Sequence, residues 1–210
     1  MTCPLCASQD SDFYHQDNRR DYWQCLHCRL VYVDPAHRLT PDAEKAIYDL
    51  HENLPDDPGY LRFLSRLAQP LMDVLHAGAK GLDYGCGPSP VLAELLTQHG
   101  YPTKGYDPFY FPTQPQSTYD FISCTEAIEH FYQPGNVIGH WMTLLQPGGL
   151  LAIMTKRVLS KERFANWHYK NDQTHVCFFS EETFQWLADY YSLRLQIVAA
   201  DVVFLHSDKV

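Results

Sequence analysis

The chain has no apolar run of the roughly 20 residues that a membrane-spanning helix needs. Its first residues are polar and include cysteines, whereas a secretory signal has a basic start and an apolar stretch. We therefore expect a cytoplasmic protein without a membrane partner. Basic residues are also scarce, with 16 Lys and Arg against 25 Asp and Glu, a net charge of −9. Because nucleic-acid affinity depends on neutralising phosphates, this balance disfavours nucleic acid and favours a small-molecule or protein acceptor.

Length and histidine spacing set two further limits. With 210 residues, 45% of them hydrophobic, the chain is too short for two full domains but fits one domain with a core and a small appendage. None of its 11 histidines forms a His-x-x-x-His pair. The spacing therefore gives no indication of a metal site built from histidines.

Four of the seven cysteines form two Cys-x-x-Cys pairs, Cys3 with Cys6 and Cys25 with Cys28. Cytosolic thiols stay reduced, so we do not expect a disulfide framework. Each pair makes a tight turn that directs two thiolates to one point, and the residues between the pairs can form a hairpin. We predict a structural Zn²⁺ ion in a closed site of four cysteines. The alternative is four unrelated buried cysteines.

A second motif lies at residues 81–90. An apolar run ends at Asp83 and is followed by Gly85 and Gly87, which predicts a strand, a loop that approaches a ligand closely, and the start of a helix. Asp107 ends another short apolar run, where a carboxylate can accept hydrogen bonds from ribose hydroxyls. Two prolines, at positions 88 and 90, remove N–H donors that a pyrophosphate would use. The motif favours a ribose-bearing ligand other than a dinucleotide.

The glycine motif resembles motif I of the class I S-adenosylmethionine-dependent methyltransferases, with Ser89 where the third glycine of that family stands. Residues 119–131 resemble the fourth strand and its Glu-His turn. Residues 144–155 resemble the Pro-Gly-Gly turn and fifth strand. These blocks follow in family order over roughly residues 78–156, and the later 174–180 segment matches a bacterial branch. The chain thus resembles a branch of this family with an amino-terminal four-cysteine zinc ribbon.

The resemblance implies an α/β fold with a Rossmann-like, mostly parallel sheet whose last strand is antiparallel. It implies S-adenosyl-L-methionine as the cofactor. The residues implied in holding this cofactor are Asp83, Gly85, Gly87, Asp107 and Thr125. The predicted activity is methyl transfer to a small-molecule acceptor. Two alternatives remain: an RNA or protein methyltransferase that uses the ribbon for recognition, and a cofactor-binding protein without catalysis.

The organisation follows from these anchors: a zinc ribbon at 1–40, a helical lead-in at 41–77 and the cofactor-binding domain at 78–210. We expect helices over 42–51 and 61–75, the latter kinked or restarted at Pro70, and a third that Ser89 caps and that ends near Gly100. Two strands should close the chain, at 193–199 and 202–206. Only 108–118, with three prolines, separates Asp107 from the next strand. This predicts loss of the third strand of the family and its helix.

Methyl transfer from a sulfonium requires alignment and exclusion of water, and a general base only where the acceptor loses a proton. The candidate bases are His130, Tyr169 and His175. His130 follows the fourth strand, where the methyl group lies in this fold, although pairing with Glu126 is an alternative role. The other two lie in a polar, aromatic insert at 167–175, either a cover for the acceptor or a packed surface loop. Residues 109–111 are aromatic and are candidates for contact with the adenine.

Overall fold

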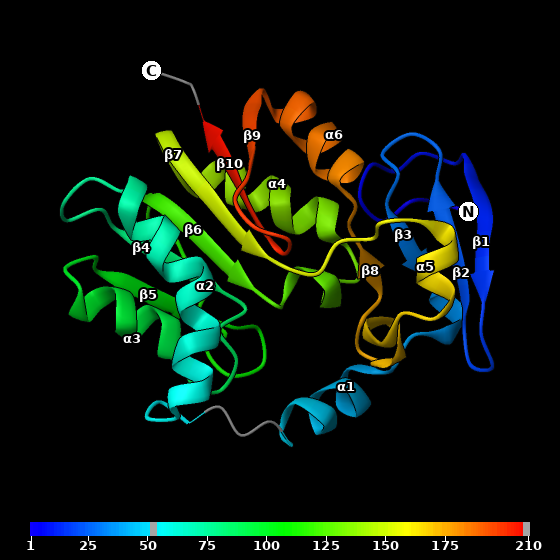
Figure 1. Cartoon of the computed structure of the whole chain (residues 1–210), viewed down its shortest axis with the longest axis horizontal. Helices are drawn as coiled ribbons and strands as arrows, with labels where there is room; N and C mark the ends of the chain where they lie inside the picture. The colour runs from blue at the N-terminus through cyan, green and yellow to red at the C-terminus, as the bar shows by residue number, and fades with distance from the viewer. Residues whose placement is uncertain (51–53, 208–210) are drawn as a thin grey trace.

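The structure, a computed structural model, describes residues 1–50 and 54–207 (Figure 1). Its main sheet contains, in spatial order, β5 (Thr103–Tyr106), β4 (Gly81–Tyr84), β6 (Tyr119–Thr125), β7 (Leu145–Met154), β10 (Val202–Ser207) and β9 (Leu193–Ile197). β4 to β7 run parallel, whereas β10 is antiparallel to both β7 and β9. The predicted Rossmann-like sheet with its antiparallel last strand is confirmed, as are the two closing strands.

Alternate residues of the central strands pack into two different cores. Along β7, Leu150 and Ala152 belong to one apolar cluster, and Leu151 and Ile153 belong to the other. Helices cover both faces: α2 (Pro58–Val74) and α3 (Val91–Gln98) contribute to the first cluster, and α4 (Pro134–Leu144) and α6 (Glu181–Tyr191) to the second. A strand buried on both faces needs a continuous apolar sequence, which explains the composition of β7.

The sheet ends at β5 within the described residues, because β5 pairs only with β4 there. Residues 108–118 contain an isolated bridge between Asp107 and Phe111 and otherwise turns and irregular backbone. Proline lacks the N–H that a strand or helix interior needs, and this segment contains three of them. The prediction that the third strand and its helix are missing is confirmed for the residues that the structure describes.

Two helices of the first core differ from the predictions at single positions. α2 continues through Pro70 to Val74, so the helix does not restart there, and the alternative of a kink at Pro70 stays a prediction. α3 begins one residue later than predicted, because Pro90 has φ −78° and ψ 53°, outside the helical region. No side chain caps α3, so the prediction of Ser89 as the capping residue is wrong. Gly100, with φ +90°, terminates the helix as expected.

The lead-in contains α1 (Pro41–Tyr48), which Thr40 caps through its hydroxyl. The predicted helix over 42–51 is thus confirmed in its first part, and His51 lies outside the described residues. Within α1, the Tyr48 hydroxyl donates to the Glu44 carboxylate at 2.7 Å, and Glu44 is buried. The lead-in therefore directs polar side chains into the protein.

The amino-terminal ribbon shares its sheet with the second half of the chain. Its strands are β1 (Ser11–Gln16), β2 (Asp21–Cys25), β3 (Val31–Val33) and β8 (Cys177–Phe178), in that order. β8 pairs antiparallel with β3, placing Phe178 opposite Val31. Cysteines of the ribbon and the aromatic residues Tyr84 and Trp141 belong to the same apolar cluster. Figure 1 shows the ribbon at one end of the long axis and α3 at the other. The ribbon and the main sheet therefore share one core, and the boundaries at 40 and 77 stay predictions.

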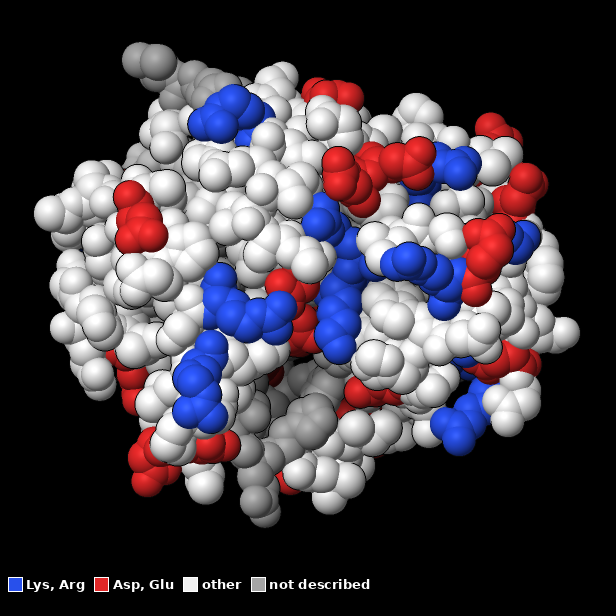
Figure 2. Space-filling view, in the orientation of Figure 1, with Lys and Arg blue, Asp and Glu red and all other residues white. Residues whose placement is uncertain are grey.

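Short elements complete the fold: η1 (Pro35–His37), η2 (Ile128–His130), α5 (Lys161–Ala165) and η3 (His168–Asn171). Among residues 1–50 and 54–207, no helix is both long enough and apolar enough to span a bilayer. Figure 2 shows that Lys and Arg on the viewed face stand in separate groups, with Asp and Glu among and around them. This face carries charge of both signs.

Candidate cofactor and acceptor site

A cavity of about 730 Å³ lies at the carboxyl ends of β4, β5 and β6. Open α/β sheets bind ligands at this edge, and the volume is ordinary for a small-molecule site. The cavity is lined by seven of the predicted site residues: Asp83, Gly85, Gly87, Asp107, Thr125, His130 and His175. Of the three candidate bases, Tyr169 is the one that does not line it. Segments far apart in the sequence thus meet around one space.

The glycine turn forms one wall of this cavity. Gly85 and Gly87 have φ of +80° and +66°, which residues with a Cβ rarely adopt. A Cβ on Gly85 would also lie 2.6 Å from the Cβ of Ala127, so the turn packs closely against the segment after β6. The Gly85 N–H donates to the Tyr106 carbonyl at 2.8 Å. The turn is therefore fixed against β5, with its backbone facing the cavity.

Asp107 holds the glycine turn as well as lining the cavity. Its Oδ2 accepts from the Gly87 N–H at 3.0 Å, and its Oδ1 accepts from the Phe109 N–H at 2.9 Å. A carboxylate has about four acceptor positions, so these bonds leave capacity for a ligand hydroxyl. Phe109 and Tyr110 line the cavity beside it, whereas Phe111 does not line it and is 40% exposed.

Asp83 lies at the base of the cavity, 4% exposed. The Ser123 hydroxyl donates to its Oδ1 at 2.8 Å. Burial raises the pKa of Asp83 to about 7, because a carboxylate loses hydration there, and the nearby Asp107 carboxylate acts in the same direction. A cationic ligand would stabilise its ionised form.

The end of β6 supplies two polar atoms with no hydrogen-bond partner among the described residues. These atoms are the Thr125 hydroxyl and Oε1 of Glu126, and both are buried in the cavity wall. Glu126 has φ +45°, in the left-handed region that costs a non-glycine residue about 1–2 kcal/mol. Strained backbone and unpaired buried groups concentrate at binding sites. The Thr125 hydroxyl and Oε1 of Glu126 therefore indicate a surface that contacts a polar ligand.

Tyr169 is buried behind the cavity, between two carboxylates. Its hydroxyl donates to Oε1 of Glu129 and lies 3.1 Å from Oε2 of Glu126. Burial, reinforced by the two carboxylates, raises the pKa of Tyr169 far above its usual value. Burial also raises the pKa of Glu129 to about 8, with the charge of Glu126 adding to the effect. Tyr169 thus positions Glu126 and Glu129, and its role as a general base stays an untested prediction.

His130 and His175 meet in the wall of the cavity, with ring centroids 4.7 Å apart. Nδ1 of His130 lies 3.2 Å from the Thr174 carbonyl oxygen, and Nδ1 of His175 lies 2.7 Å from the Tyr169 carbonyl oxygen. A carbonyl only accepts, so each Nδ1 carries the proton and each Nε2 carries a lone pair. Burial lowers the pKa of His175, which keeps this ring neutral. Both rings are suited to accept a proton or to bind a cation.

An arginine of the ribbon fixes the segment that carries His175. Arg20 is 5% exposed. Its guanidinium donates to the backbone carbonyl oxygens of Lys170, Asp172, Gln173 and His175. Four carbonyls on one buried cation hold this turn rigidly. The 167–175 insert is therefore a packed segment anchored by the ribbon, which favours the packed-loop alternative over an open cover.

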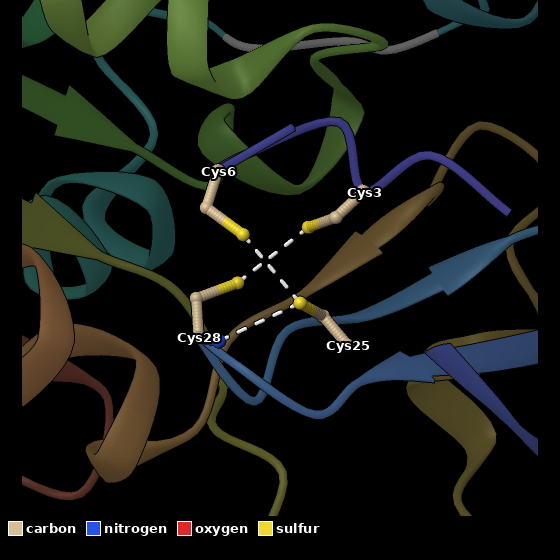
Figure 3. Close-up of side chains that lie close together, drawn as sticks. All are labelled: Cys3, Cys6, Cys25 and Cys28. Atoms are coloured by element: carbon tan, nitrogen blue, oxygen red, sulfur yellow. Dashed lines mark hydrogen bonds between the residues drawn. The ribbon is translucent and has the colours of Figure 1, made fainter. Parts of the chain in front are cut away.

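The four paired cysteines converge at the other end of the ribbon, as Figure 3 shows. The Sγ atoms of Cys3 and Cys28 lie 3.5 Å apart, as do those of Cys6 and Cys25, and all four Sγ atoms lie within 4.8 Å of one another. A disulfide requires about 2.05 Å, and a tetrahedral zinc with bonds of about 2.3 Å separates its sulfurs by about 3.8 Å. The geometry excludes disulfides and fits the predicted four-cysteine zinc ribbon.

The strand order, the glycine turn between β4 and α3, and the acid after β5 define a class I S-adenosylmethionine-dependent methyltransferase. The sequence comparison agrees, because the model of a methyltransferase domain family matches residues 50–196. The chain belongs to this methyltransferase domain family.

Curated relatives match part of the chain. The chain is 28% identical over 152 residues to the ubiquinone biosynthesis O-methyltransferase of Burkholderia cenocepacia, over 59% of this chain and 60% of that protein. The Burkholderia orbicola protein of the same name is 27% identical over the same shares. The chain thus matches about 60% of the length of these relatives.

Solved structures resemble the fold at low sequence identity. The plantazolicin methyltransferase BpumL, in complex with SAH, superposes with a TM-score of 0.52 at 16% identity, over 84% of this chain and 91% of that one. The magnesium protoporphyrin IX methyltransferase of Synechocystis PCC 6803 superposes with a TM-score of 0.50 at 13% identity, over 79% and 92%. These similarities support the fold.

Sequence reasoning did not single out several residues that line the cavity or support it. Glu44 and Tyr48 of α1 line the cavity, and Glu129 lies fully buried behind it. Arg20 is far from the site in sequence, so only the folded chain brings it there. The Glu-His turn could have indicated Glu129, because Glu129 directly precedes His130, which was a predicted site residue. No local sequence pattern indicates Glu44, Tyr48 or Arg20.

Proposed function

We propose that this protein transfers a methyl group from S-adenosyl-L-methionine to a small-molecule acceptor. The observation that carries the proposal is the cavity in which the glycine turn and two buried acids face His130 and His175. One half has the groups to hold an adenosyl cofactor, and the other has groups to handle an acceptor proton. The names of the curated relatives support a small molecule as acceptor.

The cavity fits this cofactor chemically. Asp83 presents a buried carboxylate to the cationic methionine end, and the cation would offset the cost of ionising it. Asp107 presents its remaining acceptor positions to ribose hydroxyls. The Thr125 hydroxyl offers an unpaired buried contact. The backbone of Gly85 and Gly87 allows the ligand to approach closely. When bound, S-adenosyl-L-methionine supplies a methyl group on a positive sulfur and leaves as a neutral thioether.

The acceptor side aligns the substrate and takes its proton. Nε2 of His130 or His175 carries a lone pair in the tautomer that the backbone carbonyls select, so either ring can accept a hydroxyl proton. The apolar walls, including Tyr48 and Phe131, exclude water from the transfer. Alignment of the acceptor with the methyl group accounts for most of the rate that such a reaction needs.

Zinc in the four-cysteine site has a structural role in this proposal. Four thiolates leave no coordination position for a substrate, so the ion would stabilise the ribbon fold. The ribbon in turn holds the His175 segment through Arg20. This internal task weakens the alternative in which the ribbon recognises RNA or a protein acceptor.

Calorimetric titration of the full chain tests the cofactor assignment, first with S-adenosyl-L-methionine and then with NAD. Mass spectrometry then detects S-adenosylhomocysteine after incubation with hydroxylated small molecules, with RNA and with unmodified protein in parallel. We expect cofactor binding, no NAD binding, and product only with a small molecule. Binding without product from any acceptor class would favour the non-catalytic alternative, and NAD binding would contradict the proposal outright.

A further inference from the structure

Glu129, His130 and His175 form a second cluster of metal-binding side chains, apart from the cysteines. One ligand atom from each lies within 4.8 Å of the others. Glu129 and His130 are adjacent in η2, and His175 precedes β8 by one residue. Two imidazoles and one carboxylate typically bind a divalent transition metal and leave positions open for a substrate. The two histidines line the cavity, so such positions would face the acceptor.

The orientation of both imidazoles is that of metal-binding histidines. Such residues usually donate their other ring N–H to a carbonyl or carboxylate, which fixes the tautomer and the plane of the ring. Here Nδ1 of His130 and Nδ1 of His175 each lie at hydrogen-bond distance from a backbone carbonyl oxygen. The Nε2 atoms are therefore the ligand atoms, and the Arg20 contacts hold the His175 backbone in place.

The carboxylate provides an independent indication of a cation. Glu129 is 0% exposed, and its Oε2 has no hydrogen-bond partner among the described residues, while its Oε1 accepts from Tyr169. Oε1 of Glu126 is also buried and has no partner in that part of the chain. Burying a carboxylate oxygen without a partner is costly, and the other oxygens of these two carboxylates have to share one hydroxyl, that of Tyr169. A bound cation would balance both charges.

We propose that Glu129, His130 and His175 bind a divalent transition-metal ion, such as Mn²⁺ or Fe²⁺, at the acceptor end of the cavity. A second part rests on the proposed methyltransferase function: the acceptor carries a hydroxyl group whose oxygen faces this ion. The positive charge lowers the pKa of that hydroxyl, and its proton passes to solvent, because the Nε2 lone pairs that would otherwise accept it are then bound to the ion. The oxygen then forms a bond to the methyl carbon as the sulfur–carbon bond breaks, and the electron pair of that bond stays on sulfur.

Calorimetry and electron paramagnetic resonance with Mn²⁺ test the site in the full chain carrying its ribbon zinc. Mn²⁺ binds thiolates weakly compared with zinc, so the ribbon should keep its metal. We expect one Mn²⁺ per chain with the zinc content unchanged. Co²⁺ should give a visible spectrum of nitrogen and oxygen ligands without thiolate charge-transfer bands. A chain that binds neither ion would overturn the proposal.

Two near-isosteric variants identify the ligands. Glu129→Gln keeps an acceptor for the Tyr169 hydroxyl, and His175→Asn keeps a donor near the position of Nδ1, but each removes a ligand atom. Each should weaken Mn²⁺ binding at least about tenfold, the lower limit for losing even an indirect partner of a metal. Glu94→Gln, at an exposed position of α3, and His99→Asn, at the exposed residue that follows this helix, are matched controls and should bind Mn²⁺ as the wild type does.

Measurements of folding and of cofactor binding distinguish failure of the metal site from failure of the proposed methyltransferase function. Both ligand variants should keep the thermal unfolding midpoint and affinity for S-adenosyl-L-methionine close to the wild-type values. Mn²⁺ binding that is equal in the wild type and both variants would refute this ligand set. Cofactor binding without Mn²⁺ binding would refute only the metal site, and Mn²⁺ binding without cofactor binding would refute only the proposed methyltransferase function.

Discussion

The two halves of the cavity are built in different ways. The half proposed to hold the cofactor comes mainly from one stretch of sequence, β4, the glycine turn and β5, with Thr125 of β6 added, and the contacts within that stretch are mainly backbone hydrogen bonds. The acceptor half assembles η2, the segment before β8 and a ribbon arginine, which are more than a hundred residues apart at the extremes. A local turn can form from its own residues, whereas the acceptor half depends on the folded ribbon.

This difference gives the ribbon a specific task. Its strands share a sheet with β8, and Arg20 anchors the carbonyls around His175. Disturbing the ribbon should therefore reach the acceptor half first and leave the cofactor half largely unchanged. A variant that changes one half of the cavity alone supports this difference, and a variant that changes both halves equally contradicts it.

Removal of the ribbon zinc should have the largest effect. Cys25→Ser should lose the metal and lower the free energy of unfolding by at least about 5 kcal/mol, since structural zinc contributes about 10–16 kcal/mol in isolated fingers. Hydrogen exchange should rise in residues 168–178 far more than in the glycine turn. Zinc analysis and exchange mass spectrometry measure both effects, and Cys86→Ser outside the ribbon is the control for zinc content. Equal loss of protection in both halves would contradict the comparison.

Arg20→Ala should come next, at about 3 kcal/mol of unfolding free energy, because it leaves buried carbonyls without donors. The metal of the ribbon and the affinity for S-adenosyl-L-methionine should persist, whereas turnover should fall as His175 loses its fixed position. Chemical denaturation and steady-state kinetics test this separation. Arg19→Ala, at the neighbouring exposed position, should behave as the wild type. Weaker cofactor binding in Arg20→Ala would show that the halves are coupled.

The same contrast explains which parts of the site can be predicted from the sequence. The glycine turn and Asp107 were predictable, because backbone that must adopt positive φ leaves glycines at fixed spacing. The cluster of four cysteines was predictable for a similar reason, since each knuckle is local. The pairing of Glu129 and His130 with His175 was not, because the ligands lie on separate segments without a His-x-x-x-His pattern. The start of α3 was misplaced by one residue because Pro90 fits either side of a helix boundary.

Asp107→Ala should act on the cofactor half alone. We expect affinity for S-adenosyl-L-methionine to weaken by about 1.5–3 kcal/mol, the range for losing charge-assisted hydrogen bonds. Part of this loss comes from the ribose contact and part from the glycine turn, since Oδ2 also accepts from the Gly87 N–H. Calorimetry measures the change, with Asp73→Ala on the exposed side of α2 as control. Unchanged affinity would reject the ribose assignment, and a change in zinc content would break the separation of the halves.

The smallest expected effect is a pH dependence carried by Asp83. Burial raises its pKa to about 7 in the unliganded protein, so the carboxyl is protonated below that pH and ionised above it. Only the ionised form attracts a cationic cofactor, and affinity should therefore rise with pH. The expected gain from about pH 6 to about pH 8 is near tenfold, because the ionised fraction of a group with a pKa of about 7 rises from roughly one tenth to roughly nine tenths over that range. Calorimetry in buffers of different ionisation enthalpy should detect proton release at the lower pH.

Asp83→Asn keeps an acceptor for the Ser123 hydroxyl and should flatten the profile, whereas Glu129→Gln in the acceptor half should leave it intact. A profile that keeps its slope in Asp83→Asn would assign the titration to another group.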